Sequence, residues 1–206
     1  HQDLLRISAA SAGNDNRLGA SEAPPAVISM FLGTELTEIL EAIEKGSTYA
    51  GKEKVDMEIG VHTMPKFPRD NTDRNRTSPF AFTGNRFEFR AVGSSQNVAS
   101  AAYVLNSIVA ESLNEFRAYV DALESAGEDR SSAVMAVVRR FITESKDIMF
   151  EGNGYGQEWQ CEAQRRGLRP VVNVPDAYEV YHEKQTVELF DRLGVLAPNE
   201  VEARFE

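Results

Sequence analysis

Residues 73–90 read Asp73-Arg74-Asn75-Arg76-Thr77-Ser78-Pro79-Phe80-Ala81-Phe82-Thr83-Gly84-Asn85-Arg86-Phe87-Glu88-Phe89-Arg90. The last five residues of this stretch alternate charged and aromatic side chains. Side chains of a β-strand alternate between its two faces, so the pattern predicts a strand with an Arg-Glu-Arg face and a Phe-Phe face. At a rise of about 3.3 Å per residue, the two arginines leave the backbone about 13 Å apart with Glu88 midway. That spacing suits two anions that flank a cation.

The polar face of this strand has two interpretations. It is either a solvated salt-bridge ladder on the open side of an antiparallel sheet, which is a common arrangement, or part of an anion-binding site. Arg74 and Arg76 precede a Thr-Ser-Pro turn, and a Thr-Gly-Asn turn at 83–85 leads into the strand. Two further arginines brought to the same place leave an excess of positive charge. Phosphate or carboxylate ligands explain that excess better than pairing within the chain.

The composition limits the class of protein. The chain has 206 residues, of which 42% are hydrophobic, enough for one packed domain or one and a half. The net charge of −10 argues against a nucleic-acid surface. No apolar run approaches the ~20 residues that cross a bilayer, and no signal peptide is visible. The lone Cys161 cannot form an internal disulfide. We therefore expect a cytoplasmic protein with neither nucleic acid nor membrane as a partner.

Hydrophobic spacing predicts the remaining elements. Residues 13–25 are rich in Gly, Asn, Asp, Ser and Pro and predict a loop. Apolar residues at helical spacing predict a helix at 34–45, with Thr34 as its N-cap. Alternation predicts a strand at 55–61. Further helices are expected at 97–125, packed on the sheet, at 131–149, at 157–166 around Trp159, after a capping Asp176, and after Pro198.

A glycine-rich run and the three histidines are expected to have structural roles rather than roles in binding or catalysis. The run Gly152-Asn153-Gly154-Tyr155-Gly156 lacks the spacing and the lysine of a phosphate-binding loop, so it predicts a turn with positive φ. The histidines at 1, 62 and 182 are widely separated, and none has zinc-ligand spacing to Cys161. We expect them on the surface or in packing positions.

Residues 74–90 resemble the active-site segment of the glutamine synthetases, specifically the large type III class. Residues 12–25, which read Ala12-Gly13-Asn14-Asp15-Asn16-Arg17-Leu18-Gly19-Ala20-Ser21-Glu22-Ala23-Pro24-Pro25, resemble the preceding signature of that family. The resemblance implies an α+β fold, part of the glutamine synthetase catalytic fold. Antiparallel strands would carry the active-site face and pack against long helices. It also implies two regions: 1–125, the C-terminal part of the catalytic domain, and 126–206, a helical C-terminal region.

The resemblance also implies an activity. Glutamine synthetases join glutamate and ammonia to form glutamine, using ATP, a γ-glutamyl phosphate and Mg²⁺ or Mn²⁺, and they assemble into homo-oligomeric rings, for which a dodecamer is expected here. Two alternatives remain open: a γ-glutamyl ligase acting on another amine, or a non-catalytic glutamine-synthetase-like scaffold or sensor. The retention of the arginines and of Glu22 and Glu88 disfavours a scaffold.

The resemblance assigns roles to six residues of this chain. By this correspondence Glu88 is a metal ligand, and Arg86 and Arg76 contact the nucleotide phosphates. Arg90 contacts the glutamate carboxylate and the transferred phosphoryl group. In the earlier signature, Glu22 helps to form the ammonium site and takes its proton, and Arg17 holds the substrate glutamate.

The chain departs from the family pattern in three respects. The spacing from Arg17 to Glu22 is one residue shorter than in the compact bacterial class. A further phosphate arginine, expected five residues after Arg76, falls on Ala81, and Arg74 or Lys66 is a candidate replacement. The remaining metal carboxylates of the family lie upstream of His1. With no initial methionine, the chain is expected to be the later part of a longer protein.

Overall fold

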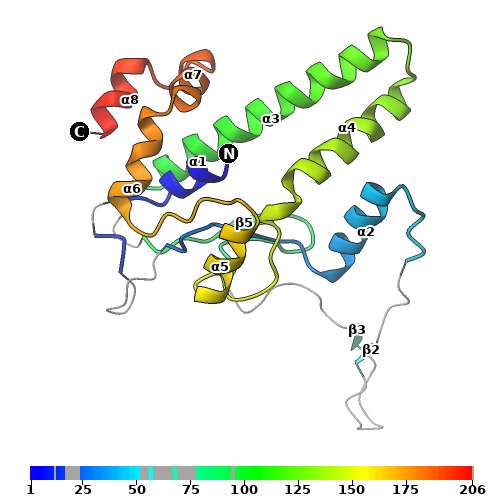
Figure 1. Ribbon diagram of the computed structural model, residues 1–206, viewed down its shortest axis with the longest axis horizontal. Coiled ribbons are helices and arrows are strands. Elements are labelled where there is room, and N and C mark those ends of the chain that lie inside the picture. The colour runs from blue at the N-terminus through cyan, green and yellow to red at the C-terminus, as the bar shows by residue number, and fades with distance from the viewer. Residues whose placement is uncertain are drawn as a thin grey trace.

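The computed structural model describes residues 1–11, 13–16, 24–51, 56–57, 67–68, 78–93 and 96–205. The fold is mixed and mostly helical, with a small three-stranded sheet (Figure 1). In that sheet β4 (Phe80–Phe82) lies between β1 (Met30–Phe31) and β5 (Phe87–Phe89), parallel to β1 and antiparallel to β5. A separate antiparallel pair joins β2 (Asp56–Met57) to β3 (Phe67–Pro68). The mixed fold class expected from the sequence is confirmed at this level.

The β4–β5 hairpin follows from the local sequence. The register places Phe82 opposite Phe87, and the amide of Thr83 donates to the carbonyl of Arg86 at 2.9 Å across the turn. Gly84 has φ +95°, a conformation that costs glycine nothing and other residues considerably more. Phe80 packs against Phe87 with ring centroids 5.5 Å apart. The expected strand is therefore confirmed at Phe87–Phe89, and its two phenylalanines lie on the same face of the sheet as Phe80 and Phe82 of β4.

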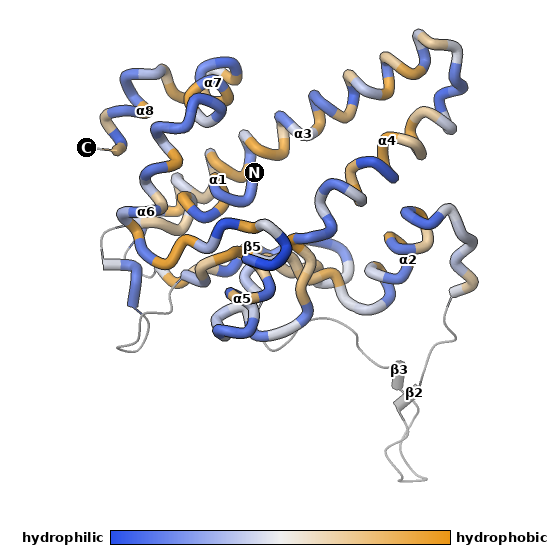
Figure 2. Tube along the Cα trace, in the orientation of Figure 1, coloured by the Kyte–Doolittle hydropathy of each residue, from blue (hydrophilic) through white to orange (hydrophobic). Residues whose placement is uncertain are grey.

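A long helical hairpin projects from the rest of the molecule (Figure 1). It consists of α3 (Ala99–Ser125) and α4 (Arg130–Ser145), whose hydrophobic and hydrophilic residues alternate along their length, as in amphipathic helices (Figure 2). Asp129 caps α4 by accepting hydrogen bonds from the amides of Ser131 and Ser132. The sequence expectation placed the first of these helices on the sheet. Its main partners are instead the helices α1, α4 and α7, because its buried residues face those helices.

The largest hydrophobic core joins the two ends of the described chain. It packs α1 (Gln2–Ile7) and α3 against η2 (Glu179–His182), α7 (Lys184–Arg192) and α8 (Pro198–Phe205). The residues of this core are Leu4, Ile7, Val104, Val180, Tyr181, Leu189, Phe190, Leu196 and Val201. The sequence at the beginning of the chain is compatible with either a strand or the end of a helix. The structure shows a helix, α1, stabilised by contacts with the C-terminal helices. None of the described helices is long and apolar enough to cross a membrane.

Three local expectations need correction. Helix α2 (Thr34–Lys45) is preceded by Gly33 at the N-cap, with φ +81°, so Thr34 is the first helical residue rather than the cap. Helix α6 (Val174–Tyr178) is capped by Asn173, whose side chain accepts from the amide of Asp176, the residue expected to cap it. The glycines at 152, 154 and 156 are all described, and none of them has a positive φ, so that expectation is wrong. At Gly152 the constraint is space, since a Cβ there would lie 2.7 Å from the Phe150 ring.

Trp159 is the anchor of α5 (Gln157–Arg165), as expected. Its side chain is fully buried, stacks on Phe150 with centroids 4.3 Å apart, and donates from Nε1 to the carbonyl of Val27 at 3.1 Å. We expect Trp159→Ala to lower the free energy of unfolding by about 3–5 kcal/mol, because it leaves a large cavity and an unpaired carbonyl.

Chemical denaturation of the Trp159→Ala variant and of a Val98→Ala control checks this expectation. Val98 is 77% exposed just before α3, so its truncation should change the free energy of unfolding by no more than about 0.5 kcal/mol. Equal losses in the two variants would contradict the anchoring role of Trp159.

Candidate functional site

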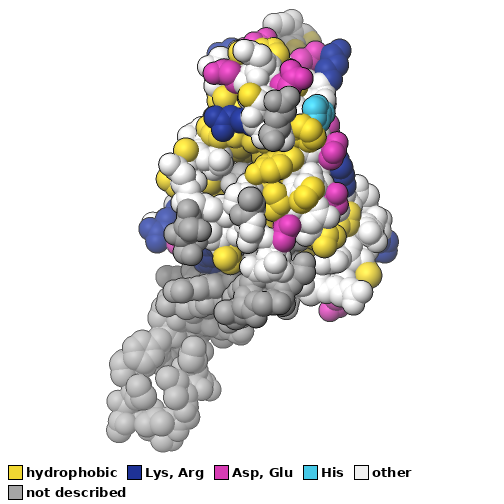
Figure 3. Space-filling model, turned by 90° about the vertical axis from the view of Figure 1, so that its left-hand side faces the viewer, with side chains coloured by type: hydrophobic (Ala, Val, Ile, Leu, Met, Phe, Trp, Pro, Cys, Tyr) yellow, Lys and Arg dark blue, Asp and Glu magenta, His cyan; other side chains and the backbone are white. Residues whose placement is uncertain are grey.

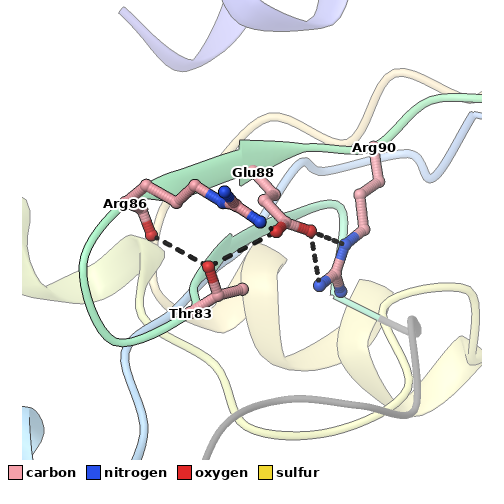
Figure 4. A network of polar contacts seen from close by, with 4 residues as sticks. All are labelled: Thr83, Arg86, Glu88 and Arg90. Carbon is pink, nitrogen blue, oxygen red and sulfur yellow. Dashed lines mark hydrogen bonds and ion pairs between the residues drawn. The ribbon is translucent and has the colours of Figure 1, made fainter.

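The structure brings Arg86, Glu88 and Arg90 together on one face of the strand β5 (Figure 4). Arg86 Nε donates to Glu88 Oε1 at 3.2 Å. Arg90 donates from Nε and Nη2 to Glu88 Oε2 at 3.3 and 3.1 Å. Thr83 Oγ1 also donates to Glu88 Oε1, at 3.4 Å. The predicted arrangement on the polar face is confirmed, and its contacts are those of the salt-bridge ladder.

Both guanidinium groups of the ladder contact the same carboxylate, that of Glu88. Hydrogen bonds from Arg90 and then from Arg86 hold the pKa of Glu88 below its usual value. The two ion pairs are therefore fully formed above the ordinary pKa of a glutamic acid, and they are lost only as the pH falls through the lowered pKa. Glu88 is thus a carboxylate at neutral pH. It is 35% exposed, whereas Arg86 is 70% exposed and Arg90 only 22%.

The register of the hairpin places Ala81 directly opposite Glu88. Residues that face each other across an antiparallel pair lie on the same side of the sheet, so Ala81 belongs to the polar face. Its side chain is fully buried. The position at which the family pattern expects a further arginine is therefore a neighbour of the carboxylate, and here it carries only a methyl group.

Several predicted site residues lie outside the described residues. They are Arg17, Glu22 and Arg76, together with Lys66 and Arg74, the two candidate replacements for the missing arginine. The described residues just after Arg76 do contact the site, since the amide of Arg90 donates to the carbonyl of Pro79 at 2.7 Å. Thr83, which sequence patterns identify only as a turn residue, is an additional partner of Glu88.

Metal binding depends on how closely His, Cys, Asp and Glu side chains gather in the described part of the chain. Within it, no group of three or more His, Cys, Asp or Glu side chains could hold a metal ion. His182 packs edge-on against the ring of Phe205, as expected of a histidine in a packing position. Cys161 is a free, exposed thiol on α5. Glu88 is thus a single carboxylate between two cations, which can complete a metal site only together with other ligands.

Comparison with known proteins identifies the family. Residues 133–206 match the family described as "Glutamine synthetase C-terminal domain". A "Glutamine synthetase" of Bacteroides fragilis (strain YCH46) is 48% identical over 189 residues, which is 90% of this chain and 26% of that protein. A "Type-3 glutamine synthetase" of Dictyostelium discoideum is 43% identical over 206 residues, 100% of this chain and 28% of that protein. The chain belongs to the glutamine synthetase family.

A third relative extends the same result. The "Glutamine synthetase" of Butyrivibrio fibrisolvens is 42% identical over 207 aligned residues, which cover 98% of this chain. The type III resemblance drawn from residues 12–25 and 74–90 is confirmed by the identity to a relative of that name. The chain spans 26–28% of the length of these three relatives.

Proposed function

We propose that this chain supplies part of the active site of a full-length glutamine synthetase, here meaning a longer protein that contains these 206 residues. The reaction joins glutamate and ammonia through a γ-glutamyl phosphate formed from ATP. The observation that carries the proposal is the Arg86–Glu88–Arg90 array on β5, in a chain 42–48% identical to proteins named glutamine synthetase.

The chemistry of Glu88 fits a shared metal ligand. Mg²⁺ and Mn²⁺ prefer oxygen ligands, and Mg²⁺ is often held by only one or two carboxylates together with substrate phosphates. Glu88 is ionised at neutral pH and partly exposed, so it can contribute one such ligand. When bound, the metal neutralises charge on the phosphates. The other ligands would come from elsewhere in the full-length protein.

The two arginines of the array suit different ligands. Arg86 is largely exposed, which favours contact with the phosphates of a mobile nucleotide. Arg90 is more enclosed, and two bonds to Glu88 Oε2 fix the plane of its guanidinium. A fixed planar fork suits the glutamate carboxylate and the transferred phosphoryl group. Phosphoryl transfer needs little covalent help from a protein, so positioning and fixed positive charge carry most of the rate.

The residues outside the described regions complete the proposal. Arg76 would add a phosphate contact, Arg17 would hold the substrate glutamate, and Glu22 would take the proton released when ammonium becomes the attacking ammonia. Proton removal by a positioned carboxylate is general base catalysis. Exclusion of water around the acyl phosphate would limit its hydrolysis.

We also propose that residues 1–125 are the C-terminal part of the catalytic domain and that residues 126–206 form a helical C-terminal region. We further propose that the full-length protein acts in the cytoplasm as a homo-oligomeric ring, a dodecamer by family analogy. Exposed apolar side chains support an assembly role for the helical hairpin: Val109 and Leu113 on α3 and Met135 on α4. Hydrophobic side chains also gather at a different place, on the face turned to the viewer in Figure 3, which is the end of the molecule that carries α6 and α8.

The proposed function is tested by incubating the full-length protein with ATP, Mg²⁺, glutamate and one amine at a time. We expect ammonium to give glutamine, with one phosphate released per amide formed. A strong preference for methylamine or a larger amine would favour the alternative ligase. No amide with any amine would favour the scaffold.

The 206-residue chain on its own is expected to form no glutamine. A two-metal phosphoryl-transfer site needs several carboxylates, and the described residues offer one candidate, Glu88. The measurement is glutamine formation by the purified chain at high Mg²⁺ and ATP, with the full-length protein as the positive control. Turnover at a rate comparable with that of the full-length protein would contradict the assignment of a partial site.

A further inference from the structure

Thr83 lies on the polar face of the β4–β5 hairpin, next to the carboxylate of Glu88. Ala81 is on that face, and side chains two positions apart in extended backbone point the same way. The amide of Thr83 donates to the carbonyl of Arg86 at 2.9 Å, which continues the pairing of the hairpin one residue beyond β4. Figure 4 shows the half-buried side chain of Thr83 between that carbonyl and the carboxylate of Glu88.

The hydroxyl of Thr83 has two acceptors within reach. Its Oγ1 lies 3.4 Å from Oε1 of Glu88 and 3.4 Å from the carbonyl oxygen of Arg86. A hydroxyl has one hydrogen and rotates to suit its surroundings, so it donates to one of the two at a time. The carbonyl already accepts from the amide of Thr83, and an ionised carboxylate is the stronger acceptor. The hydroxyl therefore favours Glu88.

The two oxygens of Glu88 are held in different ways. Oε2 accepts from Nε and Nη2 of Arg90, whose side chain is largely enclosed. Oε1 accepts from Nε of Arg86, whose side chain is largely exposed. An exposed ion pair is a weak restraint, because water screens the charges and a long side chain loses entropy when it is fixed. The short, β-branched side chain of Thr83 has few rotamers to lose.

This difference bears on how Glu88 could bind a cation. Oε1 is the oxygen that a cation can reach more easily, because its charged partner Arg86 is exposed and free to move away. Thr83 stays beside Oε1 when Arg86 leaves, since the hairpin backbone holds it. Residues that hydrogen-bond to a metal ligand fix its orientation, and their loss typically lowers metal affinity by about 10- to 100-fold.

We propose that Thr83 is a positioning residue for Glu88: its hydroxyl holds Oε1 in the orientation in which the carboxylate binds a divalent cation. The inference rests on the proposed function, in which Glu88 is a metal ligand. Thr83 contacts neither the cation nor a substrate and acts only through Glu88. A hydroxyl that merely stabilised the turn would change the melting temperature and leave the cation affinity as it is.

The first test is a Mn²⁺ titration of the full-length protein without ATP or glutamate, followed by electron paramagnetic resonance of the free ion. Thr83→Val removes the hydroxyl and keeps the β-branched shape, so we expect it to weaken one site by about tenfold. Thr83→Ser keeps the hydroxyl and should stay within about threefold of the unmodified protein. Thr143→Val is the matched control, because the hydroxyl of Thr143 donates to the carbonyl of Arg139 at 2.9 Å on α4, outside the array.

The second test places Thr83→Val in the Glu88→Gln background. If Thr83 acts through the carboxylate, its hydroxyl has little left to do once the metal-binding charge is gone. We therefore expect the double variant to bind Mn²⁺ within about twofold of Glu88→Gln alone. Melting temperatures of all variants show which of them are folded. If Thr83→Val does not fold, Thr83→Ala takes its place, with the same loss of affinity expected.

Each outcome decides between the two proposals. Equal losses in Thr83→Val and Thr83→Ser, or losses that simply add in the double variant, would mean that the hydroxyl does not act through Glu88. If Glu88→Gln weakens a site and Thr83→Val does not, the role of Thr83 is wrong and that of Glu88 stands. If Glu88→Gln itself leaves Mn²⁺ binding unchanged, the proposed metal ligand is wrong and the role of Thr83 is wrong with it.

Discussion

Glu88→Gln in the full-length protein is expected to reduce nucleotide-dependent turnover by at least about tenfold, with partial recovery at high Mg²⁺ or Mn²⁺. The substitution keeps the shape of the side chain and removes the charge that would bind the metal. Removing a residue that only hydrogen-bonds to a metal ligand typically lowers the metal affinity by about 10- to 100-fold, so removing a ligand itself should lower it at least as much. Raising the metal concentration offsets a weakened affinity by mass action. The measurement is turnover at several ATP and metal concentrations.

Glu162→Gln is the matched control for that experiment. Glu162 also lies between two arginines, accepting hydrogen bonds at 2.7 Å from Arg165 and from Arg166, which lower its pKa to about 2. It resembles Glu88 in charge and partners but lies on α5, outside the array. Its variant should retain normal turnover and metal dependence. Equal losses in both variants, without any response to metal, would mean that the array on β5 is only structural.

Arg90→Lys is expected to reduce turnover, or the apparent affinity for glutamate, by about 100-fold, and added metal should not restore it. Lysine keeps the positive charge but lacks the planar fork that Arg90 presents. Loss of one preorganised donor to a developing charge typically costs about 10²–10³ in rate. Varying glutamate and metal independently separates this pattern from that of Glu88→Gln.

Arg165→Lys provides the corresponding control, because Arg165 also uses Nε and Nη2 together, toward Glu162 at 2.7 Å each. It should leave the kinetics unchanged. Recovery of turnover by the Arg90→Lys variant at high Mg²⁺ would contradict the proposal that Arg90 binds substrate while Glu88 binds the metal.

The sequence predicts the array on β5 well because the relevant information is local. A period of two sets the face of each side chain, and the turn residues at 83–85 set the register, so Arg86, Glu88 and Arg90 must share a face. The family signatures at 12–25 and 74–90 then suggest the chemistry. Nothing in the strand itself shows whether the arginines pair with Glu88, and the structure answers that question.

Long-range packing is what the sequence leaves open. The buried Arg6 of α1 donates a hydrogen bond to the carbonyl of Val171, which lies 165 positions away, and no pattern around Arg6 indicates that contact. The same reason explains why the periodicity of α3 reveals a buried stripe but not its partners. The choice of cap is a smaller case: Gly33 and Asn173 rather than Thr34 and Asp176 begin their helices, because backbone conformation decides among neighbouring candidates.

We propose that Glu88 binds a metal ion together with ligands from the rest of the protein. The most direct measurement is a Mn²⁺ titration of the full-length protein and its Glu88→Gln variant, with Glu162→Gln in parallel, followed by electron paramagnetic resonance of the free ion. We expect Glu88→Gln to weaken at least one Mn²⁺ site by about tenfold or more and Glu162→Gln to leave all sites unchanged. Superimposable binding curves for the unmodified protein and the Glu88→Gln variant would contradict it.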